Sequence, residues 1–305
     1  MPKVTIVGAG AVGSQLAYNL AAKNLADIVL VDIVEGLPQG RALDILESMP
    51  LLDSDSKILG TNGFADLKDS DVVVVTAGLP RKPGMARDDL VQTNAKILNS
   101  VIPEVIKHSP DCILIIVTNP LSAMAQLAFR LSSFPKERVI GMAGVLDSSR
   151  LRCFIAEKLD VSVSDVDAFV IGDHGDLMVP VLSKCSVNGV PVVDILSKDD
   201  LGVVAERVRN AGGEIVSLLK NESTCFAPAA ALSEMVDCII NDKKRVLPCT
   251  VLLEGEYGVN GLFVGVPIKL GKSGVEEIIE FDLSGEEKDQ FRKFVEHIRG
   301  LSRAI

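Results

Sequence analysis

The stretch that decides the fold is KVTIVGAGAVG at residues 3–13, a short apolar run that ends in a G-x-G-x-x-G turn. Ser14–Lys23 has helical character, so the glycines lie between a predicted strand and a predicted helix. The first glycine permits a tight turn, the second lets a pyrophosphate approach the backbone, and the third lets the helix pack against the strand. The start of the helix adds free N–H groups and a positive dipole end. The whole turn is therefore predicted to bind a dinucleotide: Gly8, Ala9, Gly10, Ala11, Val12 and Gly13.

An acidic residue follows the turn at the spacing that dinucleotide binding requires. Asp32 comes about 20 residues after the last glycine, at the end of the predicted strand Ile28–Val31. A carboxylate there accepts hydrogen bonds from the adenosine ribose hydroxyls and repels a 2′-phosphate. Ile33 and Val34 supply no arginine to offset this repulsion. The sequence therefore predicts NAD as the cofactor, and not NADP.

Strand-like and helix-like segments alternate through the first half of the chain. Val72–Thr76 and Ile113–Val117 are β-branched runs of the kind found in parallel strands that are buried on both faces. Asp88–Lys107, between them, is a predicted helix. This order predicts an α/β fold with a Rossmann-type doubly wound parallel sheet.

The pattern changes after about residue 145 to mixed helices and strands. Asn188-Gly189 predicts a hairpin turn. The other predicted elements are strands at Val166–Ile171, Val246–Leu253 and Gly261–Leu270, helices at Leu201–Leu219 and Ala227–Asn241, and an amphipathic C-terminal helix. We expect residues 1–145 to form an NAD-binding domain and residues 146–305 an α+β catalytic domain, with a tight junction between them.

Composition and charge exclude several classes of function. The 305 residues are 48% hydrophobic and carry a formal net charge of −10, which disfavours nucleic acid because phosphate binding requires a basic face. No apolar run approaches the roughly 18 residues that span a bilayer. Six scattered cysteines without a CxxC pair predict reduced core residues and no metal site. The N-terminus runs directly into a strand without a signal-peptide core, so we expect a cytoplasmic protein with no membrane partner.

One of the three histidines is a candidate for proton transfer. His174 lies in GDHGD at residues 172–176, just after an apolar strand and between glycines that leave the imidazole little covered. Imidazole is suited to proton transfer near neutral pH. His108, at a helix end, and His297, on the charged side of the C-terminal helix, are expected to be structural or solvated. A loop histidine without a catalytic role remains the alternative for His174.

Two further segments supply charge near the predicted edge of the sheet. In LDSSR at residues 146–150, a helix would place Asp147 and Arg150 on one face, and on spacing alone an ordinary helix salt bridge is the preferred explanation. The segment Gly78–Arg87 follows a strand and combines two prolines and two glycines with three cations, which predicts a movable cationic loop over the cofactor. Asn119-Pro120 follows the next strand and is a candidate for a cis bond.

Together these features resemble the lactate/malate dehydrogenase superfamily, and most closely its lactate-dehydrogenase-like malate dehydrogenase branch. The resemblance covers nearly the whole chain and its motifs occur in family order: GAGAVG at 8–13, the acid at 32, TAGLPRKPGMAR at 76–87, TNP at 118–120, LDSSR at 146–150 and GDHGD at 172–176. It implies a NAD-dependent enzyme that interconverts malate and oxaloacetate, with a cis bond between Asn119 and Pro120.

The resemblance also implies individual roles. His174 would take the proton of the substrate hydroxyl, while Asp147 would orient the imidazole and stabilise its charged form. Arg150 would clamp the carboxylate beside the reacting carbon, and Arg87 would polarise the carbonyl or alkoxide oxygen. Asn119 and, by a looser match, Thr224 would also contact the substrate. The implied cofactor contacts beyond the glycine turn and the acid are Thr76, Ala77, Gly78, Asn94, Val117, Thr118 and Asn119.

Arg81 would decide the substrate. Malate enzymes of this family carry arginine at the matching position, to pair with the second carboxylate, whereas lactate enzymes carry glutamine. A buried arginine facing the methyl group of pyruvate would be left unpaired. The alternatives are lactate dehydrogenase, a non-catalytic NAD-binding protein on the same fold, and a Ser-His-Asp hydrolase. The sequence does not contain the G-x-S-x-G elbow of such a hydrolase. By the same analogy the protein is a homo-oligomer, with a tetramer favoured over a dimer.

Overall fold

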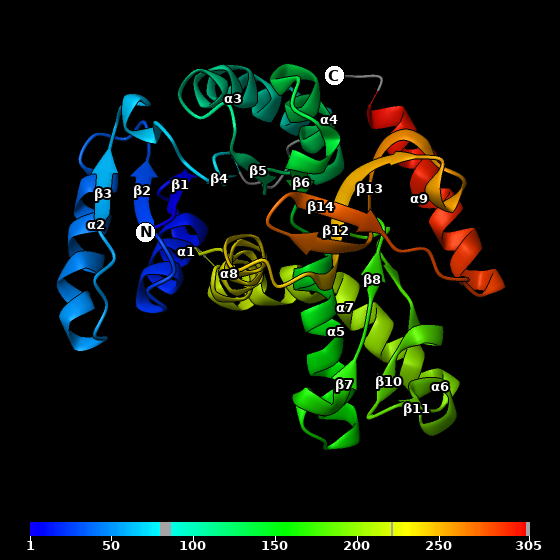
Figure 1. The fold of residues 1–305 in the computed structure, drawn as a ribbon. Coiled ribbons are helices and arrows are strands. Elements are labelled where there is room, and N and C mark those ends of the chain that lie inside the picture. Colours follow the sequence, from blue (N-terminus) through cyan, green and yellow to red (C-terminus); the bar gives the residue numbers. More distant parts are fainter. Residues whose placement is uncertain (80–86, 221, 303–305) are drawn as a thin grey trace.

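The computed structural model describes residues 1–79, 87–220 and 222–302. Within these residues, one nine-stranded sheet runs through the molecule in the order β14-β13-β12-β6-β5-β4-β1-β2-β3 (Figure 1). Six strands pair in parallel: β1 (Lys3–Val7), β2 (Asp27–Val31), β3 (Ile58–Thr61), β4 (Val72–Val75), β5 (Ile113–Ile116) and β6 (Val139–Gly141).

Helices cover both faces of the parallel strands, which explains why the central strands β4 (VVVV) and β5 (ILII) are apolar at every position. In β4, Val72 and Val74 belong to one hydrophobic core, whereas Val73 and Val75 belong to the core on the other face. The first core includes α1 (Ala11–Ala22), α2 (Leu37–Ser48) and α8 (Phe226–Ile240). The second includes α3 (Arg87–His108) and α4 (Leu121–Ser132). The doubly wound sheet predicted from the sequence is therefore confirmed.

Strands from the second half of the chain extend the same sheet. These are β12 (Arg245–Glu254), β13 (Asn260–Gly271) and β14 (Gly274–Ile278), all antiparallel to their neighbours. β12 joins the parallel part by pairing with β6 at Thr250 and Gly141. Two lobes with a tight junction were expected, and the junction proves to be a continuous sheet. The division at residues 145 and 146 remains a prediction; α5 (Gly144–Leu159) begins beside it.

Short elements complete the second half, below the sheet in Figure 1. The predicted strand Val166–Ile171 is two strands in different sheets, because residues 168 and 169 do not pair. The turn Asn188-Gly189 joins β10 to β11 with φ angles of 47° and 85°, so the predicted hairpin is confirmed. The elements are β7 (Val166–Asp167), β8 (Val170–Ile171), β9 (Val179–Pro180), β10 (Ser186–Val187), β11 (Val190–Pro191), α6 (Val192–Ile195) and α7 (Lys198–Leu219).

The last helix, α9 (Gly285–Leu301), begins at a capping box. The Ser284 side chain accepts a hydrogen bond from the Glu287 N–H, and the Glu287 side chain accepts one from the Ser284 N–H. Such a cap contributes about 1 kcal/mol to helix stability. Short 3-10 helices occur at Met49–Leu51, Ala65–Leu67, Lys136–Arg138, Val163–Asp165, Leu182–Lys184 and Glu256–Gly258. Among the described residues, no helix combines the length and the apolar character needed to cross a membrane.

Candidate active site

A cleft of about 1010 Å³ lies along the carboxyl edge of the parallel strands. Its walls come from the ends of β1, β2, β4 and β5, from the segment after β8, from the residues before α8 and from α9. Fourteen of the residues singled out in the sequence line it: Gly8, Gly10, Ala11, Val12, Gly13, Asp32, Thr76, Ala77, Gly78, Val117, Thr118, Asn119, His174 and Thr224. The glycine turn and the candidate proton-transferring histidine therefore face one shared space.

The three glycines of the turn differ in what surrounds them. Protein atoms crowd Gly8 and Gly13, whereas the space beside Gly10 is open to a ligand. Gly8 has φ of +114°, and a Cβ there would lie 2.5 Å from Thr76 Oγ1. A Cβ on Gly13 would lie 1.9 Å from the Gly8 carbonyl oxygen. At Gly10 a Cβ would meet no protein atom within 4 Å, although this residue lines the cleft. Helix α1 starts here without a side-chain cap, so its first N–H groups remain available to a phosphate.

Asp32 is fixed beside this turn. Its Oδ2 accepts a hydrogen bond from the Ala9 N–H at 2.7 Å, and its Oδ1 accepts one from the Val34 N–H at 3.0 Å. A carboxylate has about four acceptor sites, so lone pairs remain for ribose hydroxyls. The open Gly10, the uncapped helix and the braced carboxylate fit the phosphates and ribose of a dinucleotide. Ala9 itself is buried and contributes through its backbone to holding Asp32.

Two strand-end segments, residues 76–79 and 117–119, form the middle of the cleft. Thr118 Oγ1 donates a hydrogen bond to the Ala77 carbonyl at 2.6 Å, which ties the segments together. Asn94 lies behind them: its amide donates to the carbonyls of Leu79 and Asn119 and accepts from the Leu79 N–H. Its side chain is fully buried, so these hydrogen bonds brace the cleft wall, and its contact with the cofactor remains a prediction. The bond between Asn119 and Pro120 is cis, as the sequence led us to expect.

His174 is held by a buried carboxylate. Its Nδ1 lies 2.9 Å from Oδ2 of Asp147, whose side chain has no exposed surface. A carboxylate only accepts hydrogen bonds, so Nδ1 carries the hydrogen and Nε2 remains for a substrate. The negative charge of Asp147 raises the pKa of His174 above its usual value, against the opposing effect of burial. This is the arrangement of a general base with its orienting acid.

Arg150 lies on the other side of the same carboxylate. Its Nη1 donates to Asp147 Oδ1 at 3.2 Å, as the i, i+3 spacing on α5 predicted. The side chain is 7% exposed, and Nε and Nη2 are buried without a hydrogen-bond partner among the described residues. Buried donors without partners are costly, and a guanidinium presents such donors as a fork that matches a carboxylate. The arrangement can therefore bind a carboxylate next to the imidazole.

Two predicted site residues lie outside what the structure describes. Arg81 falls within residues 80–86, which the structure does not describe, and only the backbone of Arg87, at the start of α3, is described. Their predicted contacts with substrate therefore remain predictions. Thr224 lines the cleft together with Ser223, just before α8.

Sequence reasoning overlooked two groups of the cleft. Asp173, next to His174, lines it and accepts a hydrogen bond from Ser122 Oγ at 3.0 Å. His297 was expected to be structural or solvated. It also lines the cleft, because α9 contributes residues to the cleft wall. The motif GDHGD contained the signal for Asp173, whereas the position of His297 depends on a tertiary contact that no local pattern reveals. Among the described residues, no cluster of histidine, cysteine and acidic side chains could hold a metal ion.

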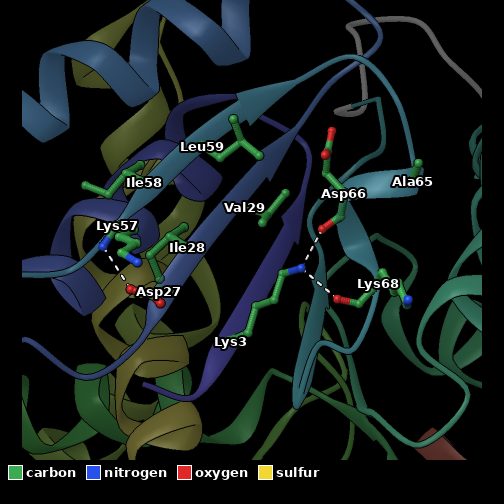
Figure 2. Close-up of a pocket in the computed structure, with 10 residues that line it drawn as sticks. All are labelled: Lys3, Asp27, Ile28, Val29, Lys57, Ile58, Leu59, Ala65, Asp66 and Lys68. Carbon is green, nitrogen blue, oxygen red and sulfur yellow. Dashed lines mark hydrogen bonds between the residues drawn. The ribbon is translucent and has the colours of Figure 1, made fainter.

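A second, smaller pocket of about 500 Å³ lies at the opposite, amino edge of the sheet (Figure 2). Lys3 crosses it and donates to the carbonyls of Asp66 and Lys68 at 2.7 and 2.6 Å. The Lys57 N–H donates to Asp27 Oδ1. Lys3 and Asp27 are thus occupied in joining the strand starts, and the residues lining this pocket include no histidine or arginine. The chemistry belongs to the cleft at the carboxyl edge.

Comparison with known proteins agrees with this geometry. Residues 2–141 match the family model of the lactate/malate dehydrogenase NAD binding domain, and residues 144–300 match that of the lactate/malate dehydrogenase alpha/beta C-terminal domain. A malate dehydrogenase of Geobacillus sp. (strain WCH70) is 50% identical over 305 residues, which cover 99% of this chain and 98% of the relative.

Solved structures give the same result. The crystal structure of Cryptosporidium parvum malate dehydrogenase has a TM-score of 0.96 and 44% sequence identity, over 99% of this chain and 98% of that one. A lactate dehydrogenase from Cryptosporidium parvum, complexed with lactic acid and NAD, has a TM-score of 0.96 and 43% identity, over 99% and 97% of the two chains. The chain belongs to the lactate/malate dehydrogenase family.

Proposed function

We propose that this protein is a NAD-dependent malate dehydrogenase that interconverts (S)-malate and oxaloacetate. The observation that carries the proposal is that His174, which lines the same cleft as the glycine turn, is held by the buried Asp147, and that Arg150 donates a hydrogen bond to the same carboxylate. A non-catalytic NAD-binding protein on this fold would have no need for a buried acid that orients an imidazole beside an arginine with unsatisfied donors.

The residues of the chain divide the work. NAD, when bound, accepts the hydride of the malate C2–H or returns it to oxaloacetate. His174 takes the hydroxyl proton during oxidation and gives it back during reduction, through Nε2. Asp147 holds the tautomer that leaves Nε2 free and stabilises the imidazolium that forms. Arg150 binds the carboxylate beside C2 through Nε and Nη2, the two nitrogens without partners in the described structure.

The second carboxylate of the substrate distinguishes malate from lactate. Arg81 supplies a cation in the segment that follows β4, and we assign it to this carboxylate on the strength of the family resemblance. The full-length relatives at about 50% identity are named malate dehydrogenase, which supports the same choice. Lactate dehydrogenase is the second candidate, because solved lactate dehydrogenases are also similar over nearly the whole chain.

The deciding experiment measures NADH oxidation by the purified protein with oxaloacetate and with pyruvate. We expect a much larger kcat/KM for oxaloacetate. Arg81→Gln should shift the ratio toward pyruvate by on the order of 100-fold, because a neutral side chain no longer pairs with the second carboxylate. Lys82→Gln, which removes a charge from the adjacent position, is the matched control and should leave the ratio near that of the unmodified protein. A preference for pyruvate in the unmodified protein would replace this proposal with lactate dehydrogenase.

We also propose that the protein is a cytoplasmic homo-oligomer, a tetramer in preference to a dimer, and acts in the tricarboxylic acid cycle. All six cysteines are free in the structure, which suits a reducing compartment. Exposed apolar side chains on α2 and α7, Leu43, Leu46, Val216 and Leu219, are suited to subunit contacts. Light scattering on a sizing column would test the stoichiometry, with a mass near four chains expected and a monomer contradicting it.

A further inference from the structure

Three consecutive residues of the catalytic segment are each held by a different element. Gly172 exchanges two backbone hydrogen bonds with Gly265 of β13, at 2.8 and 2.7 Å. Asp173 Oδ1 accepts the hydroxyl hydrogen of Ser122 in α4 at 3.0 Å. His174 is bonded to Asp147 of α5. The Gly172 contact joins the segment to the sheet, and the His174 contact forms the proton-transfer pair. The contact between Asp173 and Ser122 has no role in the function proposed above.

The contact between Asp173 and Ser122 joins the two sides of the substrate region. Ser122 is the second residue of α4, directly after the segment that carries Asn119, a predicted substrate contact. Helix α4 starts without a capping hydrogen bond from the side chain at its N-cap, Pro120. A carboxylate is favourable at such a helix start because the exposed N–H groups carry partial positive charge. Asp173 thus fastens the segment of His174 to the start of the helix that follows Asn119.

Asp173 also places a second carboxylate beside the imidazole. The charged groups that act on the pKa of His174 within the described structure are Asp147 and Arg150 on α5 and Asp173 on its own segment, and Asp176 and His297 line the same cleft. Asp147 has the largest effect on the pKa of His174 and raises it, Arg150 lowers it, and Asp173 raises it further. Burial raises the pKa of Asp173 itself, while hydrogen bonds from Ser122 and from the backbone of His174 favour its charged form.

We propose that Asp173 is a positioning residue for proton transfer: its bond to Ser122 fixes His174 relative to Asn119, and its charge favours the protonated imidazole. The proposal rests on the function argued above for its kinetic half, but the electrostatic half concerns the protein without substrate. Two substitutions separate the halves. Asp173→Asn keeps an oxygen that can accept the Ser122 hydroxyl and removes the charge. Ser122→Ala keeps the carboxyl group and removes the hydrogen bond to it.

The first readout is the titration of the three imidazoles by NMR in the protein without ligands, with the His174 signal assigned from its absence in His174→Asn. Asp173→Asn should lower the pKa of His174, and Ser122→Ala should leave it raised. Asp53→Asn is the control for loss of one negative charge. Asp53 is exposed and has φ of +50°, a conformation that asparagine adopts readily. The Asp53→Asn substitution should therefore leave the His174 titration unchanged.

The second readout is steady-state kinetics. Ser122→Ala should lower kcat for oxaloacetate reduction by about tenfold without changing the Kd of NADH, because misplacement of a reacting group slows the chemical step. An unchanged His174 titration in Asp173→Asn overturns the electrostatic half, and an unchanged kcat in Ser122→Ala overturns the positioning half. If the unmodified protein does not reduce oxaloacetate, the proposed function fails, while the titration still decides the role of the Asp173 charge. If one variant fails to fold, the other still decides its own half of the proposal.

Discussion

His174 Nδ1 lies 2.9 Å from Oδ2 and 3.1 Å from Oδ1 of Asp147, and the Asp147 side chain is completely enclosed. The imidazole is 28% exposed, so one partner of this pair faces the cleft and the other faces the interior. Because the buried negative charge cannot move away, it favours the protonated imidazole and raises the pKa of His174. The direction of this shift has consequences for both directions of the reaction.

Malate oxidation and oxaloacetate reduction should depend on pH in opposite ways. Oxidation needs a neutral imidazole to accept the proton, so kcat/KM for malate should fall below a pKa that lies above the usual value of about 6.5. Reduction needs the protonated imidazole, so its kcat/KM should persist to the same raised pKa and fall above it. Profiles of both directions measured from about pH 5 to 10 check this, because that range extends well above the interval of about pH 5 to 8 in which imidazole usually changes charge. Parallel profiles in the two directions would contradict it.

Asp147→Asn should slow catalysis and change the pH dependence of stability. The amide no longer fixes the imidazole tautomer, so kcat should fall by about 10³-fold. In the unmodified protein the pKa of His174 is raised on folding, so this pair stabilises the fold fully below the unfolded pKa, and the contribution is lost as pH rises through the folded pKa. Urea unfolding of both proteins across this window should give a difference in free energy that shrinks with rising pH. A constant difference would show that the pair does not titrate as described.

Arg150→Lys should damage substrate binding selectively. Lysine keeps the charge but cannot present two parallel N–H donors, so the KM for oxaloacetate should rise by about 100-fold while the Kd of NADH stays within about twofold. Arg152 is the matched control on the same helix, because its guanidinium donates to the Val166 and Val163 carbonyls. Arg152→Lys should leave the KM for oxaloacetate nearly unchanged. An equal rise in both variants would point to general disturbance of α5.

The glycine turn offers a test that separates folding from cofactor binding. A Cβ at position 13 would collide with the Gly8 carbonyl, so Gly13→Ala should lower the free energy of unfolding by about 1–3 kcal/mol or more. A Cβ at position 10 meets no protein atom, so Gly10→Ala should fold with nearly normal stability but weaken NADH binding by about tenfold or more, since it fills space for the phosphates. Thermal unfolding and NADH fluorescence titration measure both. Equal affinity in Gly10→Ala would mean that the phosphates lie elsewhere.

Much of the fold followed from local patterns, and the remainder depended on long-range contacts. The apolar runs Val72–Thr76 and Ile113–Val117 and the glycine turn identified a doubly wound sheet, because each requirement is met within a few residues. The strands at Val246–Leu253 and Gly261–Leu270 were also identified. Nothing local revealed that they would continue the same sheet through Thr250 and Gly141, because strand pairing at such separation is decided by packing.

The candidate site shows the same division. His174, Asp147 and Arg150 stood out because of residue type and spacing, and the structure brings them together. Asn94 remains a predicted cofactor contact, and the hydrogen bonds of its amide with the backbones of Leu79 and Asn119 could not be foreseen, because they depend on how α3 packs. His297 was taken for a solvated or structural residue, because its place at the cleft depends on the position of the whole of α9.

The kcat of His174→Asn shows whether the imidazole at position 174 moves the substrate proton. Asparagine can occupy the site and keep a hydrogen bond to Asp147, but it cannot exchange a proton near neutral pH. We predict that kcat falls by about 10²- to 10⁴-fold in both directions while the Kd of NADH stays within about twofold. A variant that binds NADH normally and keeps the kcat of the unmodified protein would contradict the account.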